Sequence, residues 1–197
     1  MRILTLFLAL AALAVFAPGC AYNFGYARRT LPGGFKQVSV PVFQNKTKFV
    51  GIEKSFTNAL VREFNRSQVA QVVDRGAAPV EIEGSIRTIT AKPSSLIAAN
   101  NVAANGGNII NLPQNTVLGS QYDVVIMAHL TVRRLADQKI IWEGDFSGEQ
   151  LYQAPQVGNM VINTVDPLYN HSALKTVVDQ IALDMMNDAH DRMTENF

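Results

Sequence analysis

Residues 122–151 read YDVVIMAHLTVRRLADQKIIWEGDFSGEQL, and two alternating runs in this stretch decide the fold. In the first run, every second residue from Val124 to Val132 is apolar, and the other face carries polar residues such as Asp123, His129 and Thr131, which is typical of a half-buried strand. A turn at 136–138 follows. The second run returns with an expected inward face of Ile140, Trp142, Gly144 and Phe146. The stretch therefore predicts an antiparallel hairpin.

Outward from this hairpin, the hydrophobic period predicts three more strands and two helices. The strands are expected at 35–43, 69–74 and 80–91, where apolar residues alternate with polar ones or form a short apolar run. The helices are expected at 51–67 and 167–194, where apolar residues recur every three or four positions.

These elements predict an α/β fold of the α+β kind, because each helix has an apolar stripe and the strands have one apolar face. We expect a two-layer sandwich in which two helices pack on one face of a mixed four- to five-stranded sheet. The length of the chain suits one domain, at 35–197.

The N-terminus has the composition of a secretory leader. A basic start precedes an apolar run at 3–17, which is shorter than the ~20 residues of a membrane-spanning helix. Gly19 and Cys20 then resemble the lipobox of bacterial lipoproteins, in which the leader is cut before an acylated cysteine. We expect a cleaved signal peptide at 1–19, lipidation of Cys20 and a lipidated tether at 20–34. An ordinary signal peptide with an unused cysteine is the alternative.

Composition argues against several classes of function. The chain has 17 basic and 16 acidic residues, so it lacks the positive charge of a nucleic-acid-binding protein. Its one cysteine, once acylated, leaves no thiol for a disulfide or a Cys-based zinc site. The sequence contains no familiar catalytic or phosphate-loop motif, and its three histidines lack metal-ligand spacing. Binding or assembly is therefore favoured over catalysis, and no cofactor is predicted.

Two segments have no clear period. Residues 93–121 contain no charged side chain, and residues 150–174 contain no Lys or Arg. A long irregular loop in a compact domain is usually functional or disordered. The uncharged loop at 93–121 could insert into a partner, and a mobile surface excursion is the alternative.

Basic residues near the expected sheet are candidates for binding phosphate or sugar acids. Arg87 and Lys92 lie along one strand, while Arg133, Arg134 and Lys139 lie near the hairpin turn. Ordinary solubilising charge at strand ends is the alternative interpretation.

The order of several segments is similar to that of the LptE family of LPS-assembly lipoproteins. The cysteine is followed by an aromatic residue (Cys20-Ala21-Tyr22), and the later segments are KQVSVPVFQNKT at 36–47, IEKSFTNALVREF at 52–64, VVDR at 72–75, VEIEGSI at 80–86 and the "WE" at 142–143. The resemblance covers nearly all of the chain after the leader.

This resemblance implies an outer-membrane lipoprotein on the periplasmic face that is not an enzyme. Its expected partners are the β-barrel LptD, which it would help to assemble and would plug, and lipopolysaccharide, which it would help to deliver to the outer leaflet. The family's basic lipopolysaccharide contacts lie in loops that here lack Lys and Arg. Arg87 and Lys92 are the substitutes we expect for contacts with lipopolysaccharide phosphate.

Two other classes stay open. CsgG- and LpoB-like periplasmic lipoproteins, which form secretion pores or activate cell-wall synthases, also begin with a strand, an Asn/Thr turn, a helix and "VVDR". A lipid-tethered hydrolase is the third interpretation. Co-purifying partners and turnover would separate the three.

Overall fold

The computed structural model describes residues 29–98, 117–153 and 167–195 of the 197-residue chain. The predicted signal peptide at 1–19 and Cys20 lie outside these residues. Residues 154–166, within the second segment without a clear period, also lie outside them.

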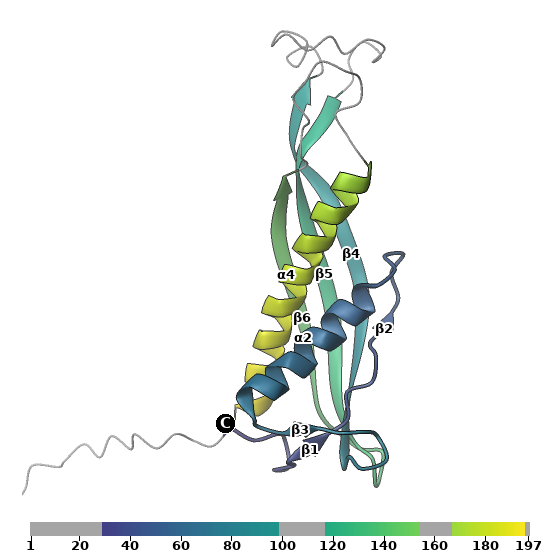
Figure 1. Ribbon diagram of the computed structural model, residues 1–197, viewed down its shortest axis with the longest axis vertical. Coiled ribbons are helices and arrows are strands. Elements are labelled where there is room, and N and C mark those ends of the chain that lie inside the picture. Colours follow the sequence, from purple (N-terminus) through teal and green to yellow (C-terminus); the bar gives the residue numbers. More distant parts are fainter. Residues whose placement is uncertain (1–28, 99–116, 154–166, 196–197) are drawn as a thin grey trace, which may run out of the picture.

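The main sheet has four strands in the order β2 (Gln44–Asn45), β4 (Val80–Ala98), β5 (Val117–Arg134) and β6 (Ile140–Gln153). β2 runs parallel to β4, whereas β4, β5 and β6 are antiparallel neighbours, so the sheet is mixed (Figure 1). The hairpin predicted from the sequence is confirmed as β5 and β6.

For one residue of that hairpin, the predicted orientation of the side chain is wrong. Ile140 was expected to face inward, but it is 42 % exposed. The register shifts between Val132 and Arg133, so Ile140 pairs with Arg133 rather than continuing the inward series. Phe146, at the other end of the predicted inward series, is 5 % exposed and lies in the core.

A bulge in β4 reassigns its two faces. Ile86 and Thr88 pair with consecutive residues of β5, so Arg87 between them has no partner in the register. One extra residue shifts the inward positions of a strand by one. Ile86 is therefore followed on the inner face by Ile89, and both pack in or against the core.

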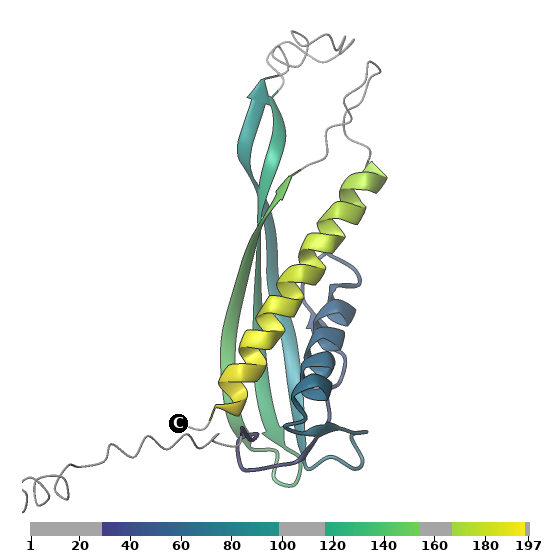
Figure 2. The same cartoon turned by 60° about the vertical axis from the view of Figure 1, so that its left-hand side comes forward.

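Two helices, α2 (Ile52–Ser67) and α4 (Pro167–Thr194), cover one face of the sheet, as predicted (Figure 2). α4 packs against β6 and against α2. Ser55 in α2 donates a hydrogen bond to Asp179 in α4, with an oxygen–oxygen distance of 2.5 Å. The two-layer α+β sandwich is confirmed.

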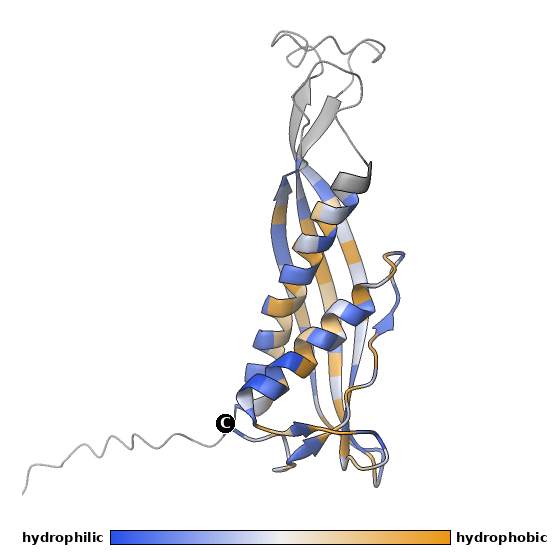
Figure 3. Ribbon diagram, viewed as in Figure 1, coloured by the Kyte–Doolittle hydropathy of each residue, from blue (hydrophilic) through white to orange (hydrophobic). Residues whose placement is uncertain are grey.

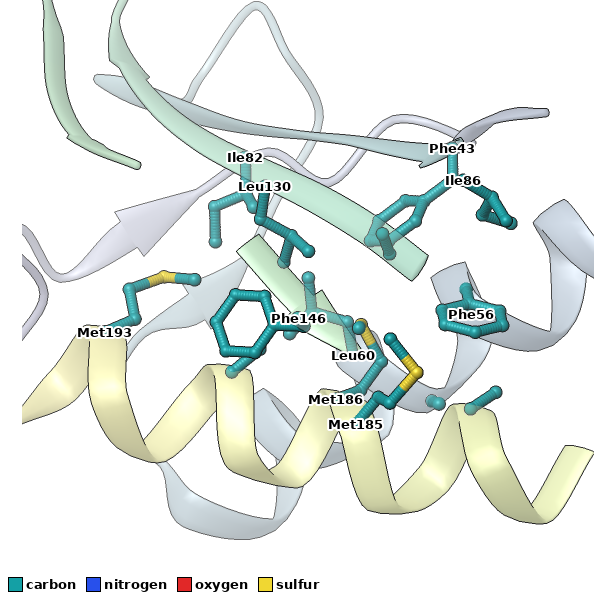
Figure 4. Close-up of a cluster of buried hydrophobic side chains, with 14 of the residues drawn as sticks. Phe43, Phe56, Leu60, Ile82, Ile86, Leu130, Phe146, Met185, Met186 and Met193 are labelled. Atoms are coloured by element: carbon teal, nitrogen blue, oxygen red, sulfur yellow. The ribbon is translucent and has the colours of Figure 1, made fainter. Parts of the chain in front are cut away.

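The core lies between these layers, where the helical stripes meet the inner face of the strands. Figure 3 shows apolar and polar residues alternating along the central strands. Ten side chains labelled in Figure 4, none more than 5 % exposed, are Phe43, Phe56, Leu60, Ile82, Ile86, Leu130, Phe146, Met185, Met186 and Met193.

A glycine lets β6 approach α4 closely. A Cβ atom added at Gly148 would lie 2.6 Å from Ile181 Cγ2 and 2.7 Å from Met185 Sδ. A side chain at this position would force the Ile181 and Met185 side chains to shift, because these two side chains lie directly against the strand backbone at Gly148.

The single strand predicted at 35–43 is wrong. β1 covers only Gln37–Val38 and pairs in parallel with β3 (Gln71–Val72) in a separate two-stranded sheet. Pro41 has no N–H to give to a ladder, and Val42, expected to share the buried face of Val38, is 64 % exposed.

The uncharged loop predicted at 93–121 is shorter than expected. β4 continues to Ala98, which pairs with Val117, and the last pair of β6 is Gln153 with Gln121. β4 and β5 therefore extend past the last pair of β6 at 96–98 and 117–120. We call the segments 93–98 and 117–122, which include this extension, the projecting hairpin (Figures 1 and 2).

The C-terminal end of the predicted tether is part of the folded domain. Leu31 is fully buried, and the Thr30 N–H donates to the carbonyl of Thr194 at 3.3 Å. Arg29 forms an ion pair with Asp191. The prediction of a tether at 20–34 is therefore wrong for residues 29–34, and its earlier part lies outside the described residues.

Candidate functional site

One face of the main sheet points away from both helices, and we call it the open sheet face. It carries the outward side chains of β4, β5 and β6, among them Arg87, His129, Asp145, Asp123 and Glu149. Within the described part of the chain no helix packs on it (Figure 2). Its side chains are mainly polar, so this face suits a polar partner better than an apolar one.

Arg87, a predicted phosphate ligand, already has a carboxylate partner on this face. Its guanidinium lies 2.7 Å from Asp145 Oδ1, and His129 Nδ1 lies 2.8 Å from the same oxygen. The Arg87 and Asp145 side chains are about half exposed or more, so solvent screens their attraction. To bind a phosphate, Arg87 would have to share or leave Asp145.

Lys92 lies further along β4, directly opposite Asp123. Five residues of extended strand separate it from Arg87, a distance of about 16 Å. One phosphate group cannot bridge that distance. The structure therefore does not bring the two predicted ligands together in one site.

A pair of carboxyl groups lies beside Lys92. A side-chain hydrogen bond with Asp123 raises the pKa of Glu149, and the negative charge of Asp123 raises it further. Glu149 therefore keeps its proton to a higher pH than an ordinary glutamate does. It adds a titratable group to the open sheet face near the base of the projecting hairpin.

The basic residues near the hairpin turn have separate partners. Arg133 contacts Glu83 at 3.1 Å, and Arg134 contacts Asp137 at 3.2 Å. Lys139 lies on the exposed turn. Since two of the three cations are already neutralised, this turn is not a concentrated anion site.

The histidines do not form a metal or catalytic site in the described residues. His129 is paired on the sheet, His171 is exposed on α4, and His190 is buried between the helices. In the part of the chain described, no group of three or more His, Cys, Asp or Glu side chains is placed to hold a metal ion.

The structure shows a groove that the sequence reading missed. It measures about 720 Å³ and lies between β6 and the C-terminal end of α4. Trp142 and Phe146 stack over Gly144 with ring centroids 6.2 Å apart, and the guanidinium carbon of Arg192 lies 5.3 Å from the Phe146 centroid. The spacing of Trp142, Gly144 and Phe146 on one strand face was a signal in the sequence, but the contact with Arg192 was not.

Among the described residues, no helix combines the length and the apolar character needed to cross a membrane. Cys20, the predicted lipidation site, lies outside the described residues. Lipidation therefore stays a prediction.

Comparisons with solved structures find several similar chains. Protein XCC0632 from Xanthomonas campestris superimposes with a TM-score of 0.51 at 11% identity, over 83% of this chain and 86% of that one. The PelC dodecamer from Paraburkholderia phytofirmans gives a TM-score of 0.48 at 10% identity, over 82% and 90%. Rare lipoprotein B from Shewanella oneidensis gives 0.37 at 15% identity, over 80% and 89%. Only the first of these three likenesses supports a shared fold.

No curated protein matches the sequence. The family model described as LptE, lipopolysaccharide-assembly, matches residues 35–196, which is nearly the whole folded domain. This match confirms the resemblance drawn from the ordered segments of the sequence. The chain therefore belongs to the LptE family of lipopolysaccharide-assembly proteins.

Proposed function

We propose that this protein is an outer-membrane lipoprotein on the periplasmic face that helps the β-barrel LptD to assemble, plugs it, and helps deliver lipopolysaccharide to the outer leaflet. The observation that carries the proposal is the family match over residues 35–196. We also propose that the protein works by binding rather than by catalysis, since the family to which it belongs is one of lipopolysaccharide-assembly proteins.

Two features of the fold support a role as a plug. The open sheet face presents paired charges to its surroundings, which suits the water-filled interior of a barrel. The projecting hairpin carries no charged residue between Pro93 and Tyr122. Because burying an unpaired charge is costly, an uncharged projection is suited to a tight fit inside another protein.

The first test removes the projecting hairpin. Residues 94–121 are replaced by Asn-Gly, which joins Pro93 to Tyr122 through a favoured hairpin turn. Tagged protein is then purified from detergent-solubilised membranes, and the recovered barrel is quantified. We expect a clear loss of barrel with an unchanged urea midpoint, because the deleted part extends past β6. Undiminished recovery would remove the hairpin from the interface.

A matched control shortens a turn at the opposite end of the main sheet. Replacing the turn at 136–138 with Asn-Gly alters β5 and β6 where the projecting hairpin is absent. We expect this variant to recover the barrel at the wild-type level. Equal losses in both variants would indicate general damage to the sheet.

The lipid anchor has its own test. Two or more acyl chains give stable membrane attachment, whereas a single chain is marginal. In cells fed labelled palmitate, wild-type protein should carry label and the Cys20→Ser variant should carry none. Equal labelling of both proteins would exclude Cys20 as the acylated residue.

For lipopolysaccharide contacts, we propose that Lys92 and Arg87 touch separate phosphates. Lys92 is exposed, whereas a phosphate would compete with Asp145 for the guanidinium of Arg87. Exposed charge pairs contribute little, so Lys92→Gln should weaken binding of labelled lipopolysaccharide by up to about five-fold, and Arg87→Gln by less. Lys139→Gln, at the far turn, is the control. Identical binding by all variants would remove both residues from the site.

A further inference from the structure

β6 is a long strand with one unpaired edge. It is the last strand of the main sheet and has 14 residues, Ile140–Gln153. From Ile140 to Leu151, no described residue contributes a backbone hydrogen bond to the outer edge of this strand. Such an edge presents a row of N–H and C=O groups that pairs readily with another extended chain.

The charges of β6 are all of one sign. Its acidic residues are Glu143, Asp145 and Glu149, with no Lys or Arg along the strand. Asp145 is held by Arg87, but Glu143 has no ion pair within the described part of the chain. These three carboxyl groups lie on the open sheet face, because their cross-strand partners alternate with the buried residues of β5. On this face, a neighbouring chain would meet negative charge.

The other side of the same edge is apolar. Trp142, Gly144 and Phe146 pair with the buried residues Val132, Leu130 and Ala128, so they share the inner face of the sheet. Here the groove is bounded by Met193 and by Arg192, whose guanidinium lies over the Phe146 ring. An apolar side chain from a neighbouring strand would fit against these rings.

We propose that the free edge of β6 binds an extended segment of a partner protein in which basic and apolar residues alternate. Side chains of a strand point alternately to the two faces of a sheet. The basic ones would face Glu143 and Glu149, and the apolar ones would face Trp142 and Phe146. Backbone hydrogen bonds would supply affinity, and this alternation would supply specificity.

Charge argues against a second copy of this chain as the occupant. Antiparallel pairing of β6 with itself would bring the acidic residues of one copy close to those of the other. Like charges opposite one another destabilise paired strands. The inference rests on the sheet edge alone, so it is independent of the proposed function.

The chain contains one tryptophan, Trp142, so its fluorescence reports directly on this edge. The purified mature lipoprotein in detergent is titrated with a short synthetic peptide of alternating lysine and valine. We expect a saturable shift in Trp142 emission. A peptide with its lysines grouped at one end, and a fully N-methylated alternating peptide, should bind much more weakly, because one lacks the two-sided pattern and the other cannot donate backbone hydrogen bonds.

Matched variants test the charge. Glu143→Gln should weaken binding of the alternating peptide by about two- to five-fold, the range expected for an exposed charge. Asp184→Asn, an exposed acidic residue on α4, should leave it unchanged. Equal binding of the alternating, grouped and N-methylated peptides would overturn the proposal. So would an emission shift that depends on protein concentration alone, since that would indicate pairing between copies.

Discussion

His190 joins the ends of the two helices and makes the fold sensitive to acid. Its side chain is 2 % exposed, its Nε2 lies 2.8 Å from Ser67 Oγ, and its ring meets that of Phe64 edge-on at 5.0 Å. Burial lowers the pKa of His190, an effect that the nearby Asp191 opposes. The unfolded chain therefore takes up a proton first as the pH falls.

The pH dependence of the free energy of unfolding follows from this lowered pKa. The neutral ring contributes its full stability above the ordinary histidine pKa of about 6.5. That contribution is lost as the pH falls from there through the lower folded-state value. Urea unfolding should give a lower free energy of unfolding at about pH 5 than at about pH 7.5, and His190→Gln should reduce the difference. The exposed His171→Gln serves as control, and a His190→Gln curve parallel to wild type would contradict the assignment.

Gly148 sets the distance between β6 and α4. Gly148→Val would place new atoms against Ile181 and Met185, so the helix or the strand must move. Overpacking of this kind costs about 1–3 kcal/mol. The free energy of unfolding in urea measures it. Gly76→Ala, where an added Cβ meets nothing within 4 Å, should change that free energy little. Equal stability of Gly148→Val and wild type would mean that this contact is loose.

At the scale of the element, the bulge in β4 leads us to expect that the protein still folds when Arg87 is deleted. Arg87 is the extra residue, so removing it leaves Ile86 and Ile89 two positions apart on the same inner face. The loss should be limited to the exposed ion pair with Asp145, worth at most about 1 kcal/mol. Deleting Val125, which is paired within β5, should instead turn half of that strand inside out.

Soluble yield and urea midpoint distinguish the two deletions. The chain lacking Arg87 should remain folded, and the chain lacking Val125 should not. If both deletions unfold the protein, then Arg87 holds the strand by more than its ion pair. If both fold, the register of the central strand is less strictly set than its buried face indicates.

The elements that the sequence predicted well are those with a clean period. Apolar residues recur every second position in the central hairpin and every three or four positions in both helices. These periods place the apolar residues on one face, so they determine whether the element is a strand or a helix. The predicted strand at 35–43 had the same period, but Pro41 interrupts it and turns Val42 outward. A short-range pattern does not say whether a neighbouring strand is available to pair.

The sequence predicts a loop where the projecting hairpin lies, for a related reason. Residues 96–98 and 117–120 pair only with each other, beyond the last pair of β6, so no third strand constrains their composition to alternate. The edge groove was missed because Arg192 and Phe146 meet only after α4 folds onto β6. Arg87 and Lys92 were grouped by sequence proximity, although an extended strand separates them by about 16 Å.

At the scale of the whole molecule, the two ends to which we assign the anchor and the barrel contact lie far apart. Arg29, the first described residue, contacts Asp191 near the C-terminus, and the projecting hairpin lies at the opposite end of the domain (Figure 1). β4 alone has 19 residues, which span roughly 60 Å as extended strand. If Cys20 is anchored as proposed, the projecting hairpin points away from the membrane surface that holds the anchor.

This geometry predicts that the length of the tether matters less than its presence. A flexible segment of n residues reaches roughly 5–6 Å times the square root of n, so the proposed tether, counted over 21–28, would reach about 16 Å and one lengthened by about 20 residues would reach about 30 Å. The domain would then be confined to a layer about twice as thick. Inserting a Gly/Ser segment after Ala27 should therefore reduce barrel recovery by no more than about two-fold, whereas Cys20→Ser removes the confinement and should reduce it much further. Quantified co-purification from membranes checks both variants. Complete loss of the barrel in the insertion variant would mean that the tether itself positions the domain, and the folded surface would then no longer account for the interaction.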